Sequence, residues 1–126
     1  MIQTIKHTLE NAHKGWGKAV FDDSPPNFTV MPCLSIYTIN RVPAASGDGK
    51  SLPFFHHWIA IDVWMKNTLK LQDRERVLKD VVLVLLGIEN CELMIENIRH
   101  IKDTNNVHYV VEVYCVGGLE DDYRRN

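Results

Sequence analysis

The chain has 126 residues and carries 14 Lys and Arg against 16 Asp and Glu, which gives a formal net charge of -2. This length fits a single domain spanning residues 1–126 with a real hydrophobic core, and this charge gives no bulk electrostatic reason to expect binding to nucleic acid or to an acidic membrane. The longest apolar run, residues 81–86, is far shorter than the ~20 residues that cross a bilayer, and we expect no cleavable secretion signal at the N-terminus.

The cysteine pattern indicates a reducing environment. The 3 cysteines, Cys33, Cys91 and Cys115, form no CxxC pair. An odd number without metal-binding or redox spacing is typical of reduced thiols in a cytoplasmic protein. We interpret them as small core residues.

The N-terminal segment predicts a short amphipathic helix. Ile2, Ile5, Leu9 and Ala12 recur at helical spacing, and the glycines on either side of Trp16 end the pattern. Such a helix has one apolar face to bury. It is a candidate to cover the second helix of the chain.

The next segments predict a turn-rich connection and a strand. Residues 19–26 start apolar and end in Asp, Ser and Pro, which fits a loop or a short edge strand. β-branched and aromatic residues then dominate, and Pro32 is tolerated only at an edge, a bulge or a strand start. We therefore expect a strand over about Cys33 to Asn40.

Residues 41–53 predict a long mobile loop. The segment is rich in Gly, Ala, Ser and Pro and has no apolar period. A structureless connection of this length is uncommon in a compact domain and often has a function. Because the segment is too polar to bury and too long to be only a connector, we expect it to project towards a lumen or a docking partner and to become ordered on contact, and Arg41 and Lys50 give it local positive charge.

The stretch from Phe55 to Lys66 alternates with a period of two and predicts the central strand. One face carries His57 and four aliphatic residues at odd positions, which suits a core. The other face carries Trp58, Asp62 and Trp64, which is unusual for a plain solvent face. This second face is a candidate interaction surface.

The following stretch changes to a helical period. Asp73 stands where an N-cap would, and apolar residues recur at three- and four-residue intervals as far as Leu86. Gly87 offers a left-handed stop. The second half, residues 81–86, is apolar nearly all round, so we expect this helix to be covered on more than its sheet side.

The C-terminal part predicts a β-hairpin and a tail. Residues 91–102 alternate imperfectly, which requires a bulge near Asn97 or an irregular segment. Residues 103–106 have the composition of a turn, and residues 107–116 form a clear strand that pairs back. The charged residues 119–126 should fray. The chain thus predicts an α+β fold in the order α-β-β-α-β-β, with a mixed, mostly antiparallel sheet flanked by two helices.

The 6 histidines raise the possibility of a metal site. His56 and His57 point to opposite faces of a strand, so both cannot bind one ion without distortion, and a site would need His100, His108 or a cysteine across the sheet. The default interpretation is no metal, no cofactor and no catalytic residue. The alternative is a small metal-dependent hydrolase that uses His56 or His57 with Asp62, whose pKa desolvation could raise.

The tryptophans allow two interpretations. Trp58, Trp64 and Trp16 either lie in the core under a helix or anchor a subunit interface, where Trp is enriched. Both hold together in an oligomer. A dimeric small-ligand-binding regulator is a further alternative, which a defined pocket would indicate.

Three stretches carry a family resemblance. They are VFDDSPPNFTVMPCLSIY at residues 20–37, HHWIAIDVWMKN at residues 56–67 and DRERVLKDVVLVLL at residues 73–86. Their order resembles the tail-terminator and tail-completion proteins of long-tailed phages and prophages. The sequence departs from that pattern in the length of residues 41–53 and at Met65, where a small polar residue is frequent.

The resemblance implies a structural protein of the virion that caps the tail tube or joins tail to head. Such proteins work as rings, commonly hexameric, without cofactor or catalysis. Its expected partners are copies of itself, tail-tube proteins and head-connector proteins, with DNA passing through the lumen and no membrane. It would act in the virion and in the bacterial host cytoplasm during assembly. Arg41, Lys50, Trp58, Asp62 and Trp64 are the candidate interface residues.

Overall fold

The fold was analysed in a computed structural model, which describes residues 1–23, 31–89, 91–102 and 105–117. The elements run in the order α1 (Ile2–Glu10), β1 (Val20–Asp22), β2 (Cys33–Ala45), β3 (Ser51–Lys66), α2 (Leu71–Leu86), β4 (Met94–Lys102) and β5 (Asn106–Gly117). The predicted α+β class is confirmed. The order differs from the prediction by one element, because residues 20–22 form a short edge strand, one of the two forms that the sequence left open.

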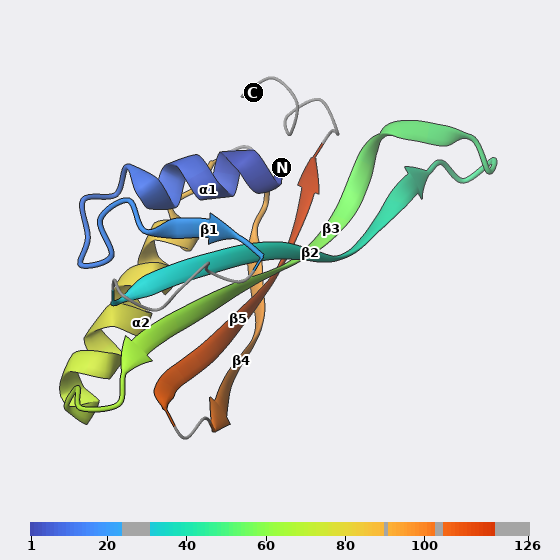
Figure 1. The fold of residues 1–126 in the computed structure, drawn as a ribbon. Coiled ribbons are helices and arrows are strands. Elements are labelled where there is room, and N and C mark those ends of the chain that lie inside the picture. Colours follow the sequence, from blue (N-terminus) through green and yellow to red (C-terminus); the bar gives the residue numbers. More distant parts are fainter. Residues whose placement is uncertain (24–30, 90, 103–104, 118–126) are drawn as a thin grey trace.

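The 5 strands form one mixed sheet in the order β1-β2-β3-β5-β4 (Figure 1). β1 pairs with β2 in parallel, and the other neighbours are antiparallel. The bulge predicted near Asn97 is confirmed, since the register of β4 on β5 shifts between Ile95 and Asn97. The end of the predicted connection at residues 24–26 and the predicted tail at residues 119–126 lie outside the described residues.

Both helices pack on the same face of the sheet, where they enclose the hydrophobic core (Figure 1). Ile59, Ile61, Val63 and Met65 of β3 point into this core and are fully buried, as the alternation predicts. All three cysteines are buried thiols. Burial raises the pKa of Cys33 to about 11 and that of Cys115 to about 12, so both stay protonated at neutral pH.

The two helices also contact each other. Ile5 and Leu9 of α1 and Val81 and Leu85 of α2 are buried in the shared core. This confirms that the first helix covers part of the second. α1 ends at Glu10, two residues before the apolar pattern ends at Ala12, and the Trp16 indole Nε1 donates a hydrogen bond to the carbonyl of Leu9.

α2 ends at Leu86, as predicted, but its predicted start and the predicted conformation of Gly87 are wrong. The helix begins at Leu71 with Lys70 in the N-cap position, so Asp73 lies within the first turn and caps nothing. The Arg74 guanidinium instead donates hydrogen bonds to the carbonyls of Asn67 and Leu69, which ties the preceding turn to the first turn of the helix. Gly87 has a right-handed conformation, with φ of -81°, and therefore supplies no left-handed stop.

The predicted mobile loop at residues 41–53 is also wrong. β2 continues to Ala45 and β3 already begins at Ser51, so that the segment is a β-hairpin with cross-strand partners such as Val42 and His56. The turn is closed by a hydrogen bond of 2.8 Å from the Ser46 amide to the Lys50 carbonyl. We call residues 39–55 the arm. Figure 1 shows that the arm projects well beyond the rest of the sheet.

Pairing geometry explains why prolines fit in the arm. β1 pairs only with Leu34 to Ile36 of β2, and β5 reaches only as far as Phe55 of β3. Pro43 and Pro53 therefore lie where each strand has a neighbour on one side only. Proline, which lacks an amide hydrogen, is tolerated at such edges.

The buried side of α2 provides a test of the packing. We expect Leu85→Ala to lower the free energy of unfolding by about 2–5 kcal/mol, because Leu85 is fully buried and its removal leaves a cavity. Leu86→Ala is the matched control, since Leu86 is 55% exposed and should change stability by less than about 0.5 kcal/mol. Urea denaturation followed by circular dichroism measures both. Equal effects would contradict the packing described here.

Candidate interaction surface on the open face of the sheet

The face of the sheet opposite the helices, which we call the open face, is covered by no described helix. The even-numbered residues of β3 point to this face. Trp58, Asp62 and Trp64 therefore lie on the same surface, as the sequence predicts, with the two indoles partly exposed and the carboxylate buried. The open face continues onto the arm, because Val42 is the cross-strand partner of His56.

An aromatic cluster lies on the open face at the base of the arm. Trp58 and Tyr114 are cross-strand partners, and their ring centroids are 5.2 Å apart. His56 stacks on Tyr114 at 5.8 Å, and its Nδ1 shares a hydrogen bond of 2.6 Å with the Tyr114 hydroxyl. These contacts hold the three rings as a preorganised, partly exposed surface, which is typical of interface anchors.

A second cluster surrounds Asp62 near the other end of β3. The Trp64 indole stacks on His108 at 3.7 Å, and its Nε1 donates a hydrogen bond of 3.3 Å to the Ser35 hydroxyl. His108 Nε2 lies 3.5 Å from Asp62 Oδ1, and neither buried atom has a well-formed hydrogen bond among the described residues. The contact is therefore an ion pair when the imidazole is protonated.

Burial dominates the electrostatics of Asp62. It raises the pKa of this carboxyl, whereas His108, Ser35 and Arg99 act in the opposite direction without cancelling it. The charged form of Asp62 is thus held at a cost in stability. This is the pKa direction that the sequence predicts.

Between the two clusters lies an ion pair. Arg99 Nη2 of β4 is 2.7 Å from Glu112 Oε1 of β5. The half-buried Tyr37 interacts electrostatically with both charges of this pair. Burial, and then the negative charge of Asp62, raise the pKa of the Tyr37 phenol, whereas Arg99 lowers it by a smaller amount. Tyr37 is therefore a neutral hydrogen-bonding group at the centre of the open face.

The structure does not bring together the residues of the proposed hydrolase site. His57 points to the helix side and is buried, with Nε2 3.2 Å from the carbonyl of Gly117. At ~3.3 Å per residue along the strand, Asp62 is roughly 17 to 20 Å from the two histidines. In the part of the chain that the structure describes, no group of three or more His, Cys, Asp and Glu side chains is placed to hold a metal ion.

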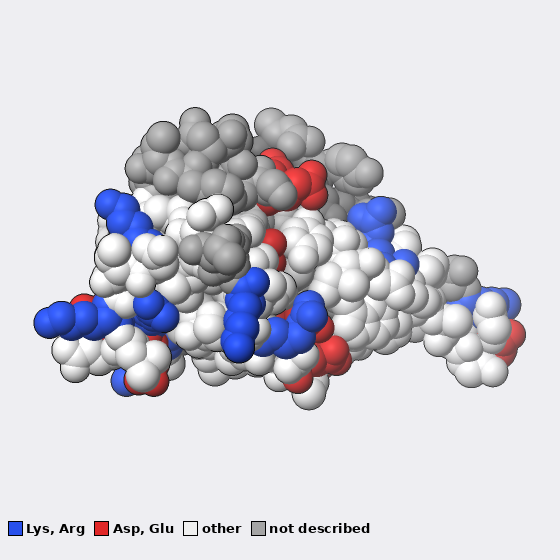
Figure 2. Space-filling model, turned by 60° about the horizontal axis from the view of Figure 1, so that its bottom comes forward, with Lys and Arg blue, Asp and Glu red and all other residues white. Residues whose placement is uncertain are grey.

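Arg41 and Lys50, the other two predicted site residues, both lie in the arm. The Arg41 guanidinium lies 5.8 Å from the centroid of the Phe55 ring, in a cation–π contact. Lys50 is exposed in the turn. Figure 2 shows the arm as a narrow projection, with charged side chains gathered at its far end.

Sequence reasoning missed the apolar character of the arm. Val42, Leu52 and Phe54 are 41%, 40% and 49% exposed, which is unusual for large apolar side chains. The available signal was the alternation of Leu52 and Phe54 on either side of Pro53. It also missed the roles of His108 and Tyr114, because the pairing register that joins them to β3 is not readable from the sequence.

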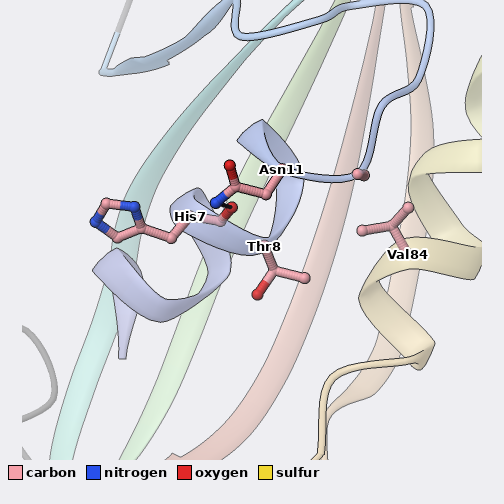
Figure 3. A pocket seen from close by; sticks show the side chains of 5 residues that line it. His7, Thr8, Asn11 and Val84 are labelled. Carbon is pink, nitrogen blue, oxygen red and sulfur yellow. Dashed lines mark hydrogen bonds between the residues drawn. The ribbon is translucent and has the colours of Figure 1, made fainter.

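A hollow between α1 and α2 bears on the alternative of a small-ligand regulator. It has a volume of about 520 Å³ and is lined by His7, Thr8, Asn11, Ala12 and Val84 (Figure 3). The polar side chains of the hollow point in different directions, and the Asn11 side-chain amide donates to the His7 carbonyl. The hollow therefore lacks the convergent polar groups that orient a small ligand.

A comparison with protein-family models finds no match, and neither does a comparison with curated proteins. Within the described residues, no helix combines the length and the apolar character needed to span a membrane. The open face and the arm are therefore interpreted from their own geometry.

The raised pKa of Asp62 predicts a specific pH dependence. In the unfolded chain, Asp62 loses its proton above the ordinary carboxyl pKa of ~3.9, whereas in the folded chain it still holds the proton at that pH. The free energy of unfolding of the wild type should therefore fall as pH rises, until the folded carboxyl also ionises. Asp62→Asn removes this titration. We expect the free energy of unfolding of the wild type to fall relative to that of Asp62→Asn from about pH 4 upward. Urea denaturation over a pH series measures the difference.

Asp48→Asn is the control with opposite sign. Hydrogen bonds from the Ser46 hydroxyl and the Lys50 amide lower the pKa of Asp48. The wild type should therefore gain stability relative to Asp48→Asn as pH rises. A constant difference between the wild type and Asp62→Asn would contradict the buried carboxylate.

Proposed function

We propose that this chain is a structural assembly protein that self-associates into a closed ring, and that it caps the tail tube of a long-tailed phage or joins the tail to the head. Two lines of reasoning support the proposal. The α+β fold, with a mixed sheet and two helices, is the fold that the resemblance of residues 20–86 implies. The arm presents exposed apolar side chains, which a partner would cover.

The exposed apolar side chains of the arm are the observation that carries the proposal. A two-stranded hairpin is marginally stable in water, and this one also presents Val42, Leu52 and Phe54 to solvent. Exposed apolar groups on a projecting element are typical of a protein interaction site. The aromatic cluster of His56, Trp58 and Tyr114 extends the same surface onto the body of the sheet.

The proposed ring follows from how such a surface closes. When a patch meets a different patch on the next copy, the assembly forms a ring if the rotation closes. A hexamer is the form that the resemblance implies. The partners would be copies of this chain, tail-tube proteins and head-connector proteins, in the virion and in the host cytoplasm during assembly. No cofactor takes part, and DNA would pass through the lumen without specific contacts.

Self-association of the purified chain is the first test. We expect native mass spectrometry and electron microscopy of the concentrated protein to show a closed ring. Replacing both Leu52 and Phe54 with Ser should shift the protein to monomer, because the two side chains supply apolar contact area of the arm. Leu71→Ser is the control, since Leu71 is 63% exposed but lies on α2, away from the arm. Wild-type protein that stays monomeric at every soluble concentration would contradict a self-assembling ring.

A complementation assay tests the role in the virion. A phage lacking this chain should produce heads and tails that do not join or tails of abnormal length, seen by electron microscopy. We expect the wild type and Leu71→Ser, but not the Leu52→Ser and Phe54→Ser double variant, to restore complete particles. Restoration by the double variant would remove the role assigned to the arm.

A further inference from the structure

A second exposed apolar surface lies between α2 and β4. It is a groove of about 290 Å³, lined by Glu75, Leu78, Lys79, Val82, Leu83 and Ile98. Leu83 and Ile98 are 54% and 42% exposed. We call this surface the α2–β4 groove.

Among the residues that the structure describes, none closes this groove. α1 contacts α2, and Val81 and Leu85 face the core, so these two contacts account for two sides of the helix. Leu83 lies on a third side, where no described element covers it. The expectation that this apolar helix is covered on more than its sheet side is therefore met only in part within one chain.

The groove also lies beside an unpaired edge of the sheet. β4 is an end strand, and among the described residues no strand pairs with its outer edge. A 9-residue edge strand with exposed Ile98 and Ile101 is a surface that soluble proteins normally protect. An occupant of the groove would protect this edge as well.

The arm and the groove cannot meet within one chain. From Phe54 in the arm, β3 runs 12 further residues to Lys66 before the loop that precedes α2, or roughly 40 Å at ~3.3 Å per residue. The 16 residues of α2 turn back by only about 24 Å. Figure 1 shows the arm and α2 at opposite ends of the molecule. Each surface is therefore available to a different copy.

We propose that the arm of one copy docks in the α2–β4 groove of a second copy, with Phe54 as the anchor against Leu83 and Ile98. This inference rests on the proposed self-association and names the two surfaces that form it. The groove has the size of a pocket for large side chains, and Phe54 is the largest exposed apolar side chain of the arm. Burial of an aromatic anchor in a pocket is the usual centre of an interface.

The charges around both surfaces are compatible with this contact. The turn of the arm carries Asp48 and Lys50, and the groove carries Glu75 and Lys79 at its rim. With Arg41, the arm has one net positive charge, whereas the two rim charges of the groove cancel, so no like-charge excess opposes docking. An apolar centre surrounded by charged residues is the common arrangement of a protein interface. Because the two patches differ, the contact is head to tail and is able to close a ring.

Two single variants test the contact. Phe54→Glu places a charge on the arm and Leu83→Glu places one in the groove, and both positions are exposed, so both chains should fold. Alone, each variant should weaken self-association by at least about 30-fold. An equimolar mixture should form a heterodimer and nothing larger, because only one pair of intact surfaces remains. Native mass spectrometry measures the species, and Leu71→Glu is the control that should assemble like the wild type.

The outcomes separate this inference from the proposed function. If Phe54→Glu is monomeric but Leu83→Glu assembles normally, the arm meets another surface: the inference fails and the self-assembling arm stands. If both variants assemble like the wild type, the inference fails and self-association proceeds through other surfaces. If the wild type never assembles, the inference and the proposed function both fail. If both are monomeric and their mixture gives no heterodimer, the head-to-tail contact is overturned.

A cysteine pair gives a second, positive test. The three native cysteines are buried, whereas Phe54 and Leu83 are exposed. A double variant with Phe54→Cys and Leu83→Cys in one chain therefore places one exposed thiol in the arm and one in the groove. Under mild oxidation we expect a ladder of chains linked head to tail on a non-reducing gel. Either single variant should give no ladder. A dimer formed by Phe54→Cys alone would show arm-to-arm contact and overturn the inference.

Discussion

The pairing of β3 along its whole length is the constraint on which the rest of the structure depends. β5 pairs with its residues Phe55 to Lys66, and β2 pairs with it from Ser51 to Trp64. Because side chains alternate along a strand, this pairing fixes which residues enter the core under the helices and which form the open face. The aromatic cluster, the buried Asp62 and the direction of the arm all follow from the register of this one strand.

The end of that pairing creates the surface to which we assign a function. Beyond Phe55, towards the turn of the arm, β3 no longer pairs with β5, and the part of β2 that lies opposite no longer pairs with β1. No described element packs against the remaining two-stranded part, and the side chains of Val42, Leu52 and Phe54 are exposed. In the proposed contact, a second copy of the chain would give the arm the packing against a helix that a two-stranded hairpin needs for stability.

The sequence predicted what depends on short-range periodicity. The alternation from Phe55 to Lys66, the apolar stripe of α2 and the bulge near Asn97 are all present. Residues 41–53 were misjudged because Ala, Gly, Ser and Pro have low strand propensity, whereas cross-strand pairing at an edge overrides it. The contacts of Asp62 with His108 and of Trp58 with Tyr114 were out of reach, since they depend on a register between distant strands.

Hydrogen exchange of the arm amides, compared between dilute and concentrated protein, tests the central claim most directly. The account predicts that the amides of residues 39–55 exchange quickly in dilute solution and become protected as the protein self-associates, together with those of β4. The amides of Ile59 and Ile61 in the core should be protected in both. Arm amides whose exchange is the same at all concentrations would contradict the account.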